Sequence, residues 1–177
     1  RFVLPHIAHA PLEPVNAMKF VEDDMAAYSA SMPLATAPGT VWNYHDGNTI
    51  MLAHLIRTAA GGKPEDALRF ARRELFAPLG MNHVTLQLDA SGTIEGSSKM
   101  LASARDWARF GQLYLNDGIA GGKRILPEGW VNYSASATPN AWVGIGAGFW
   151  TNQGDSIGAK FRITHGWPRD AFFAKGT

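Results

Sequence analysis

One tyrosine in this sequence stands where a phenol could serve as a catalytic base. The stretch PGTVWNYHDGNT, residues 38–49, begins with a Pro-Gly turn and runs into a helix-prone segment, and it places Tyr44 between Trp42 and the pair His45-Asp46. The pKa of a free tyrosine is about 10, so its phenol becomes a useful base at neutral pH only where a neighbouring ammonium favours the phenolate. Local physics alone favours a packed tyrosine that only satisfies its hydroxyl.

Ser156 is a second candidate for chemistry. It lies in GDSIG, residues 154–158, which matches the G-x-S-x-G nucleophile elbow of α/β-hydrolases. The elbow works only when a strand enters the turn and a helix leaves it. Here TNQ precedes the motif and the run AKFRIT, which is typical of a strand, follows it. We therefore predict a hairpin loop, and an α/β-hydrolase built on Ser156 stays as a rival interpretation.

The other polar clusters are weaker candidates. His6 and His9 could hold a metal, but no third ligand has a recognisable spacing and a proline lies on either side of the pair, so a terminal loop is expected. Asp23-Asp24 and His54 are expected on solvent-facing sides of helices. The sequence therefore implies no metal and no organic cofactor.

The composition of the chain limits its partners. With 177 residues, 46% of them hydrophobic, the chain has the size of one globular domain. Its net charge of +1 implies no basic face for phosphates, so a nucleic-acid partner is not expected. There is no cysteine, and no apolar run approaches the roughly 18 residues of a membrane span.

Helices are predicted over most of the chain from apolar residues at helical spacing. The predicted segments are 15–32, closed by Pro33; 48–60, with Met51, Leu52, Leu55, Ile56 and Ala59 on a buried stripe; 64–76; 103–117, opened by a capping box of Ser103 and Asp106, with Trp107, Phe110 and Leu113 to Leu115 on its apolar side; and 126–136, led by Pro127.

Strands are predicted mainly near the end of the chain. Short runs typical of strands lie at 142–150, which glycines interrupt, and at 160–164 and 170–174, and an earlier alternating run lies at 84–88. Helices that precede strands, rather than alternate with them, indicate an α+β fold. We predict one domain over residues 1–177, with a helical part at about 15–136 and a strand-rich tail at about 141–177.

The order of several motifs carries a family resemblance. PGTVWNYHDGNTIMLAHLI is followed by LFAPLGM, GSSKMLASARDWARFGQLYLNDG, KRILPEGWV, GFWTN and PRDAFFAKG. From about Asp24 to its end, the chain thereby resembles the serine β-lactamase-like hydrolases: class C β-lactamases, D-alanyl-D-alanine carboxypeptidases, related esterases and hydrolases of 6-aminohexanoate oligomers. The resemblance implies a mostly helical domain of the β-lactamase/transpeptidase-like fold with an incomplete central sheet.

The resemblance also implies roles for residues around Tyr44. Members of that family attack an acyl group with the serine of an S-x-x-K motif, while its lysine and the tyrosine of a Y-x-N or Y-x-S motif manage the proton. Tyr44 matches that tyrosine, and Asp46 stands where Asn or Ser is usual; an ionised Asp46 can accept but not donate a hydrogen bond to a substrate. Trp42 and Trp150 are expected as pocket walls.

The chain departs from the family pattern at the nucleophile. No S-x-x-K occurs in the 177 residues. Ser97-Ser98-Lys99 places its lysine too close to share a helical face with either serine, and Lys160 lies four residues after Ser156. The third family motif is expected at or after residues 174–177, whose Lys175-Gly176-Thr177 is not K-T-G. We therefore expect an internal fragment of a family member.

The expected function is hydrolysis of a small-molecule amide or ester through an acyl-serine, with Tyr44 as general base and the isolated chain inactive. A non-catalytic binding or assembly module is the alternative. A fragment would expose strand edges and apolar surface, so we expect it to form a homodimer through those edges. The choice among β-lactam, peptide, ester and oligoamide substrates stays open, as does the choice between the bacterial periplasm and cytoplasm.

Overall fold

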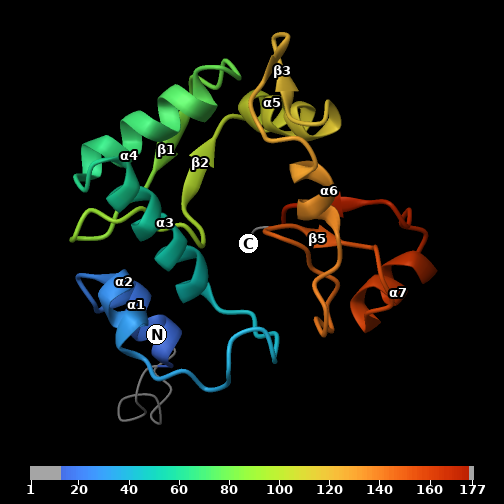
Figure 1. Ribbon diagram of the computed structural model, residues 1–177, viewed down its shortest axis with the longest axis horizontal. Coiled ribbons are helices and arrows are strands. Elements are labelled where there is room, and N and C mark those ends of the chain that lie inside the picture. Colours follow the sequence, from blue (N-terminus) through green and yellow to red (C-terminus); the bar gives the residue numbers. More distant parts are fainter. Residues whose placement is uncertain (1–12, 176–177) are drawn as a thin grey trace, which may run out of the picture. The chain divides into compact units, whose positions relative to one another are not determined.

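The structure is an α+β arrangement of helices with short strands in small sheets. The computed structural model describes residues 13–175, and Figure 1 shows the elements that these residues form. They are α1 Pro14–Phe20, α2 Met25–Ser31, α3 Asp46–Ala60, α4 Pro64–Ala71, the π-helical turn η1 Arg72–Phe76, β1 Val84–Leu86, β2 Met100–Ala102, α5 Ala104–Leu115, β3 Ile119–Ala120, β4 Lys123–Arg124, α6 Trp130–Ala135, β5 Trp150–Thr151, α7 Ile157–Thr164 and β6 Phe172–Phe173.

The strands of the described residues pair only in twos, as β1 with β2, β3 with β4 and β5 with β6. The last two pairs are antiparallel, with Trp150 opposite Phe173 in the second. The predicted α+β class is therefore confirmed. A helix with the length and hydrophobicity to cross a bilayer does not occur within residues 13–175.

The described residues divide into two compact units. The first unit contains residues 13–33, 45–67 and 86–100, and the second contains 34–44, 68–85 and 101–175. The single domain predicted for residues 1–177, with its helical part and strand-rich tail, stays a prediction.

The core of the first unit lies among α1, α2 and the start of α3, which are neighbours in Figure 1. Met18, Met25, Ala26 and Ile50 are buried there, and Val15, Tyr28 and Met51 pack against them. The single helix predicted over 15–32 is wrong, because it breaks into α1 and α2. The carboxylate of Asp24 accepts a hydrogen bond from the Ala27 amide at 2.8 Å, so Asp24 caps α2 instead of lying on a solvated helix face.

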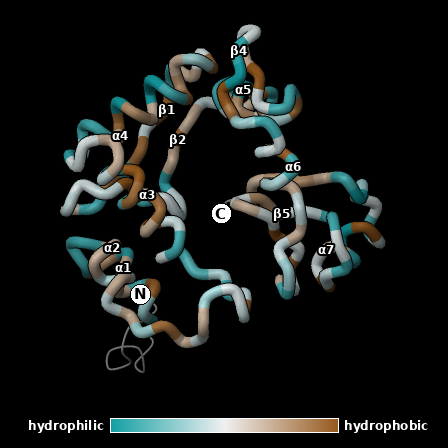
Figure 2. The backbone as a smooth tube through the Cα atoms, viewed as in Figure 1, coloured by the Kyte–Doolittle hydropathy of each residue, from teal (hydrophilic) through white to brown (hydrophobic). Residues whose placement is uncertain are grey.

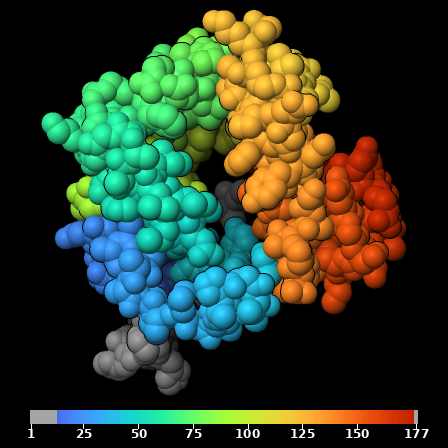
Figure 3. Space-filling view, in the orientation of Figure 1, coloured from blue at the N-terminus to red at the C-terminus, as the bar shows by residue number. Residues whose placement is uncertain are grey.

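Helix α3 confirms the predicted helix but buries a different face. Ile50 is fully buried, whereas Leu52 of the predicted stripe is 58% exposed, and Leu55 and Ile56 are exposed too. In the space-filling view the side chains of α3, in teal, lie at the surface of this unit (Figure 3). A Cβ on Gly47 would lie 2.8 Å from Ser29 Oγ, so the backbone of α3 approaches α2 closely at this glycine.

Helix α4 and the turn η1 together confirm the helix predicted over 64–76, with a π-helical end. Hydrophilic and hydrophobic residues alternate along α4, as expected of a helix with one packed face (Figure 2). Strand β1 confirms the start of the strand predicted over 84–88. Helix α6 begins at Trp130 instead of near Pro127, after Gly129 in the left-handed conformation.

Helix α5 in the second unit begins as its sequence predicted. Ser103 Oγ accepts a hydrogen bond from the Asp106 amide at 3.2 Å, which confirms one half of the capping box. The buried carboxylate of Asp106 instead accepts hydrogen bonds from the His83 amide and the Arg109 guanidinium, both at 2.8 Å. Burial by itself raises the pKa of Asp106, but the hydrogen bonds from His83, Ser103 and Arg109 outweigh it and hold the pKa below its ordinary value.

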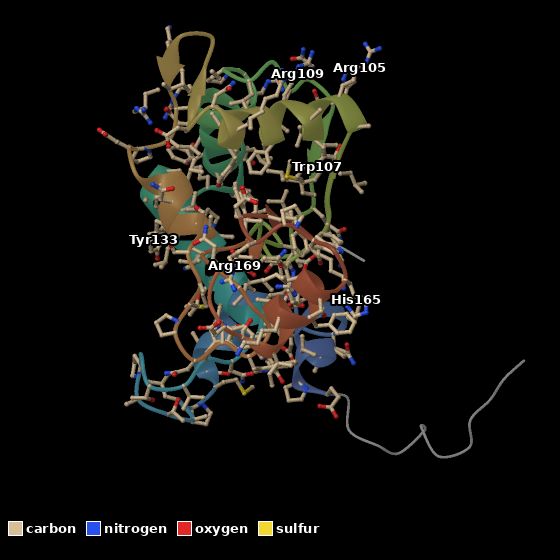
Figure 4. All side chains as sticks on the ribbon, turned by 90° about the vertical axis from the view of Figure 1, so that its right-hand side faces the viewer. Arg105, Trp107, Arg109, Tyr133, His165 and Arg169 are labelled. Atoms are coloured by element: carbon tan, nitrogen blue, oxygen red, sulfur yellow. The ribbon has the colours of Figure 1, made fainter. Side chains whose placement is uncertain are left out.

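The packed side of α5 meets an aromatic cluster. The ring centroids of Tyr114 and Phe149 are 4.7 Å apart, and those of Phe149 and Phe172 are 5.6 Å apart. Leu113 is buried as predicted, but Leu115 and Trp107 are exposed. Figure 4 shows Arg105 and Arg109 extending from α5 on the side opposite to Trp107. The predicted apolar side is therefore correct for Leu113, which is buried, and for Phe110 and Tyr114, which are half-buried, and it is wrong for Trp107 and Leu115.

The segment KFRIT, predicted as a strand over 160–164, is helical and forms the end of α7. Ser156 caps this helix, since its Oγ accepts a hydrogen bond from the Ala159 amide at 3.1 Å. A Cβ on Gly158 would lie 2.3 Å from the Val143 carbonyl oxygen, so the helix packs closely through its first turn. The predicted hairpin loop at Ser156 is therefore wrong. Of the predicted tail strands, the one at 142–150 overlaps β5 only at Trp150, and the one at 170–174 contains the two residues of β6.

The burial of α3 gives a test of this core. We predict that Ile50→Ala lowers the free energy of unfolding by about 2–5 kcal/mol, because it leaves a cavity at a fully buried site. Leu52→Ala on the exposed side of the same helix is the matched control and should cost no more than about 0.5 kcal/mol. Urea denaturation followed by circular dichroism measures both. Equal losses would contradict the burial of this face.

Candidate functional site

Tyr44 lies in an aromatic wall made of Trp42, Tyr44 and Trp150, all in the second unit. The Tyr44 ring centroid is 6.4 Å from that of Trp42 and 6.5 Å from that of Trp150. Tyr44 is 57% exposed, so its hydroxyl is not simply packed in a core. The structure thus brings together three of the four predicted site residues, and a phenol between two indoles is held while it remains accessible.

Two cations contact the Trp150 end of this aromatic wall. The Lys175 Nζ atom lies 5.7 Å from the Trp150 ring centroid, and the Arg162 Cζ atom lies 5.8 Å from it. Lys175 is exposed, whereas Arg162 is partly buried and hydrogen-bonded. The sequence drew attention to Lys175 only through the departure of residues 175–177 from K-T-G, and it gave no sign of Arg162. Cations over an indole face are a favourable arrangement.

Asp46, the fourth predicted site residue, belongs to the first unit and is paired with a lysine. It is the first residue of α3, and its Oδ2 atom lies 2.5 Å from Lys19 Nζ. His45 caps the same helix, since its Nδ1 atom accepts a hydrogen bond from the Gly47 amide at 3.0 Å. The carboxylate of Asp46 therefore already carries an ammonium partner.

Lys19 also contacts the buried carboxylate of Glu95. Its Nζ atom lies 3.4 Å from Glu95 Oε1, and Lys99 Nζ lies 3.7 Å from Oε2. The hydroxyls of Ser97 and Ser98 donate hydrogen bonds to Glu95 Oε1 at 2.6 and 2.9 Å. Burial by itself lowers the pKa of Lys19, but Asp46 and then Glu95 outweigh it and raise the pKa above 10.5.

Ser98 and Lys19 resemble a nucleophile-base pair in distance only. Lys19 Nζ donates a hydrogen bond to Ser98 Oγ at 3.3 Å. A lysine that activates a serine must be neutral, whereas two carboxylates keep Lys19 protonated. This cluster therefore compensates the buried charge of Glu95 and supplies no base for Ser98.

Ser156 does not have the geometry of a nucleophile elbow. A strand and a helix flank it, as that motif requires. Its backbone angles, however, are φ −60° and ψ 152°, an ordinary extended conformation without the strain of the elbow. Its hydroxyl oxygen accepts the capping hydrogen bond of α7. The serine serves to start a helix.

Among residues 13–175, no group of three or more His, Asp or Glu side chains is placed to hold a metal ion. The pair His6 and His9 lies outside the described residues.

The Lys19 pairs give a pH-dependent prediction. Lys19→Met should lower the free energy of unfolding by about 2 kcal/mol at neutral pH, because it removes the nearest cation from buried Glu95 and from Asp46. Since folding raises the pKa of Lys19, its contribution is fully present below the ordinary pKa of 10.5 and is lost as the pH rises through the higher folded-state pKa.

Urea denaturation of the parent chain and of Lys19→Met between pH 7 and pH 11.5 measures this difference. It should shrink toward zero at the alkaline end. Lys63→Met, at an exposed lysine of the same unit, is the control. A difference that stays constant or grows with pH would contradict the assigned role of Lys19.

Comparison with known proteins identifies the family of the chain. The Beta-lactamase family model matches residues 6–176. Over 91 residues the chain is 31% identical to 6-aminohexanoate-dimer hydrolase from Paenarthrobacter ureafaciens, a match that covers 51% of this chain and 22% of that relative. The chain thus spans about a fifth of the length of the curated relative. These matches confirm the resemblance predicted from the sequence motifs, and the chain belongs to the β-lactamase family.

Proposed function

We propose that these residues carry the tyrosine base of a serine hydrolase that cleaves amide or ester bonds through an acyl-serine. Membership of the β-lactamase family and the hydrolase name of the relative support the reaction class. The single observation that carries the site is the aromatic wall, in which Tyr44 is accessible between Trp42 and Trp150. The serine and lysine of S-x-x-K do not occur in the 177 residues, so sequence outside them supplies both.

In this mechanism the Tyr44 phenolate accepts the proton of the serine hydroxyl as its oxygen attacks the substrate carbonyl carbon. The tetrahedral intermediate collapses to the acyl-serine, and Tyr44 gives the proton to the departing amine or alcohol. A water molecule then attacks the acyl carbon and passes a proton to Tyr44. The bond between the acyl carbon and the serine oxygen breaks, the product leaves as a carboxylic acid, and the proton on Tyr44 returns to the serine oxygen. The lysine of S-x-x-K is the ammonium that favours the phenolate.

Asp46 stays a predicted substrate contact. Its carboxylate lies against Lys19 Nζ, so a substrate donor that hydrogen-bonds to Asp46 shares the carboxylate with that ammonium. The curated relative is named for acting on the dimer of 6-aminohexanoate. By analogy we propose small amide-linked oligomers as the first substrates to test, with esters second.

The alternative function is a binding or assembly module that has lost catalysis. The absence of S-x-x-K from these residues favours it, as do the exposed apolar side chains Leu52, Leu55 and Ile56. The homodimer through strand edges stays a prediction under both functions.

We predict that the 177-residue chain by itself does not turn over nitrocefin or short p-nitrophenyl esters, because the family nucleophile is not among its residues. Absorbance assays against a buffer blank measure this. Turnover by the bare chain would contradict the proposal, and its loss in Ser156→Ala with retention in Tyr44→Phe would select an α/β-hydrolase built on Ser156.

In the enzyme that contains S-x-x-K together with these residues, Tyr44→Phe should lower kcat by roughly 10²–10⁴-fold, because it removes the group that moves the proton. KM should change little, since the ring and its contacts with the indoles remain. Ser156→Ala is the control and should keep parental kcat. Parental turnover by a folded Tyr44→Phe enzyme would exclude the tyrosine as base.

A further inference from the structure

The position of Trp150 in the aromatic wall needs an explanation beyond strand pairing. Strands β5 and β6 have two residues each. So short a pair gains little from its own hydrogen bonds, and isolated two-stranded ribbons are marginal even when longer. Something else must hold the Trp150 side chain where it meets Tyr44.

Arg162 of α7 supplies a dense set of contacts to the backbone around Trp150. Its Nε atom donates to Asn152 Oδ1 at 2.6 Å, and its Nη2 atom donates to the Thr151 carbonyl at 2.7 Å. The guanidinium also donates to the carbonyls of Val143 at 3.2 Å and Gly144 at 3.3 Å. Figure 1 shows β5 and α7 next to each other. One side chain thus ties α7, the loop at 143–144 and β5.

The same guanidinium lies against the aromatic pair of the two strands. Trp150 and Phe173 are directly opposite each other in the β5–β6 register. The Arg162 Cζ atom lies 5.8 Å from the Trp150 ring centroid and 5.4 Å from that of Phe173. Both rings of this cross-strand pair therefore contact one cation, which holds the two rings in place on the same face of the strand pair.

We infer that Arg162 is the positioning residue of the aromatic wall and acts through Trp150 on Tyr44. This role rests on the function proposed for Tyr44. Removing the guanidinium leaves the carbonyls of Val143 and Thr151 without this donor, and it leaves the exposed Lys175 as the cation that still contacts Trp150. The indole then loses the orientation in which it meets the Tyr44 ring.

Gly144 offers a second way to disturb the packing between Arg162 and β5. Its φ is +71°, and a Cβ there would lie 2.6 Å from the Thr151 carbonyl oxygen, 2.7 Å from Arg162 Nη2 and 2.8 Å from Ser156 Oγ. Gly148 has a φ of +84° with nothing within 4 Å of such a Cβ. Gly148→Ala therefore has the same backbone strain without the collision, and it is the matched control for Gly144→Ala.

The test is ¹⁹F NMR of the 177-residue chain labelled with 5-fluorotryptophan, in which Trp150→Phe assigns the Trp150 resonance among six. Arg162→Gln and Gly144→Ala should each shift the Trp150 resonance by more than its linewidth. Arg162→Lys keeps the positive charge but loses the planar set of guanidinium donors, and it should shift the resonance less. Arg105→Gln, at an exposed arginine of α5, and Gly148→Ala should leave it in place. With 3-fluorotyrosine, Arg162→Gln should also shift the Tyr44 resonance, assigned by Tyr44→Phe.

An unmoved Trp150 resonance in folded Arg162→Gln, or an unmoved Tyr44 resonance beside a shifted Trp150, would overturn the inference. So would failure of both Arg162 variants to fold while Gly144→Ala leaves Trp150 unmoved, because Arg162 would then serve the whole unit. None of these readouts uses turnover. A failure here therefore leaves the Tyr44→Phe test of the proposed function intact, and the reverse also holds.

Discussion

A charged group buried away from water needs an opposite charge or hydrogen bonds to compensate its lost hydration. This constraint applies in both units of the chain. In the first unit, fully buried Glu95 is met by Lys19, which also holds Asp46 at the start of α3. In the second, buried Asp106 is met by Arg109, and the Arg162 guanidinium by backbone carbonyls and Asn152. In the first unit, the Lys19–Glu95 pair joins α1 to a segment that does not belong to the apolar core of Met18, Met25, Ala26 and Ile50.

The same constraint decides what the polar candidates can do. Lys19 lies within hydrogen-bond distance of Ser98, yet its two carboxylate partners keep it protonated and so unfit as a base. Ser156 is committed to the N-terminus of α7. Tyr44 differs because its ring is held by Trp42 and Trp150 while its side chain remains exposed. We therefore propose the Tyr44 phenol as the group that transfers the proton in the family mechanism.

The sequence patterns correctly predicted features that depend on residues close together in the chain. Ser103 caps α5, as the spacing of Ser103 and Asp106 predicted. The patterns failed at helix starts and at the packed face of α3. Asp24 caps a new helix within 15–32, and Ser156 caps a run that was typical of a strand. Helix α3 buries Ile50 and Ala53, whereas Leu52, Leu55 and Ile56 of the predicted stripe are exposed. The contacts of Lys19 with Glu95 and of Arg162 with Trp150 join separate segments of the chain. No residue spacing in the sequence predicts them.

The central claim is that Tyr44 serves a serine that lies outside these 177 residues. The most direct measurement is mass-spectrometric mapping of the serine that a fluorophosphonate labels in the enzyme containing S-x-x-K together with this chain. The account predicts an adduct on the serine of S-x-x-K and none within residues 1–177. An adduct on Ser98 or Ser156 would contradict it.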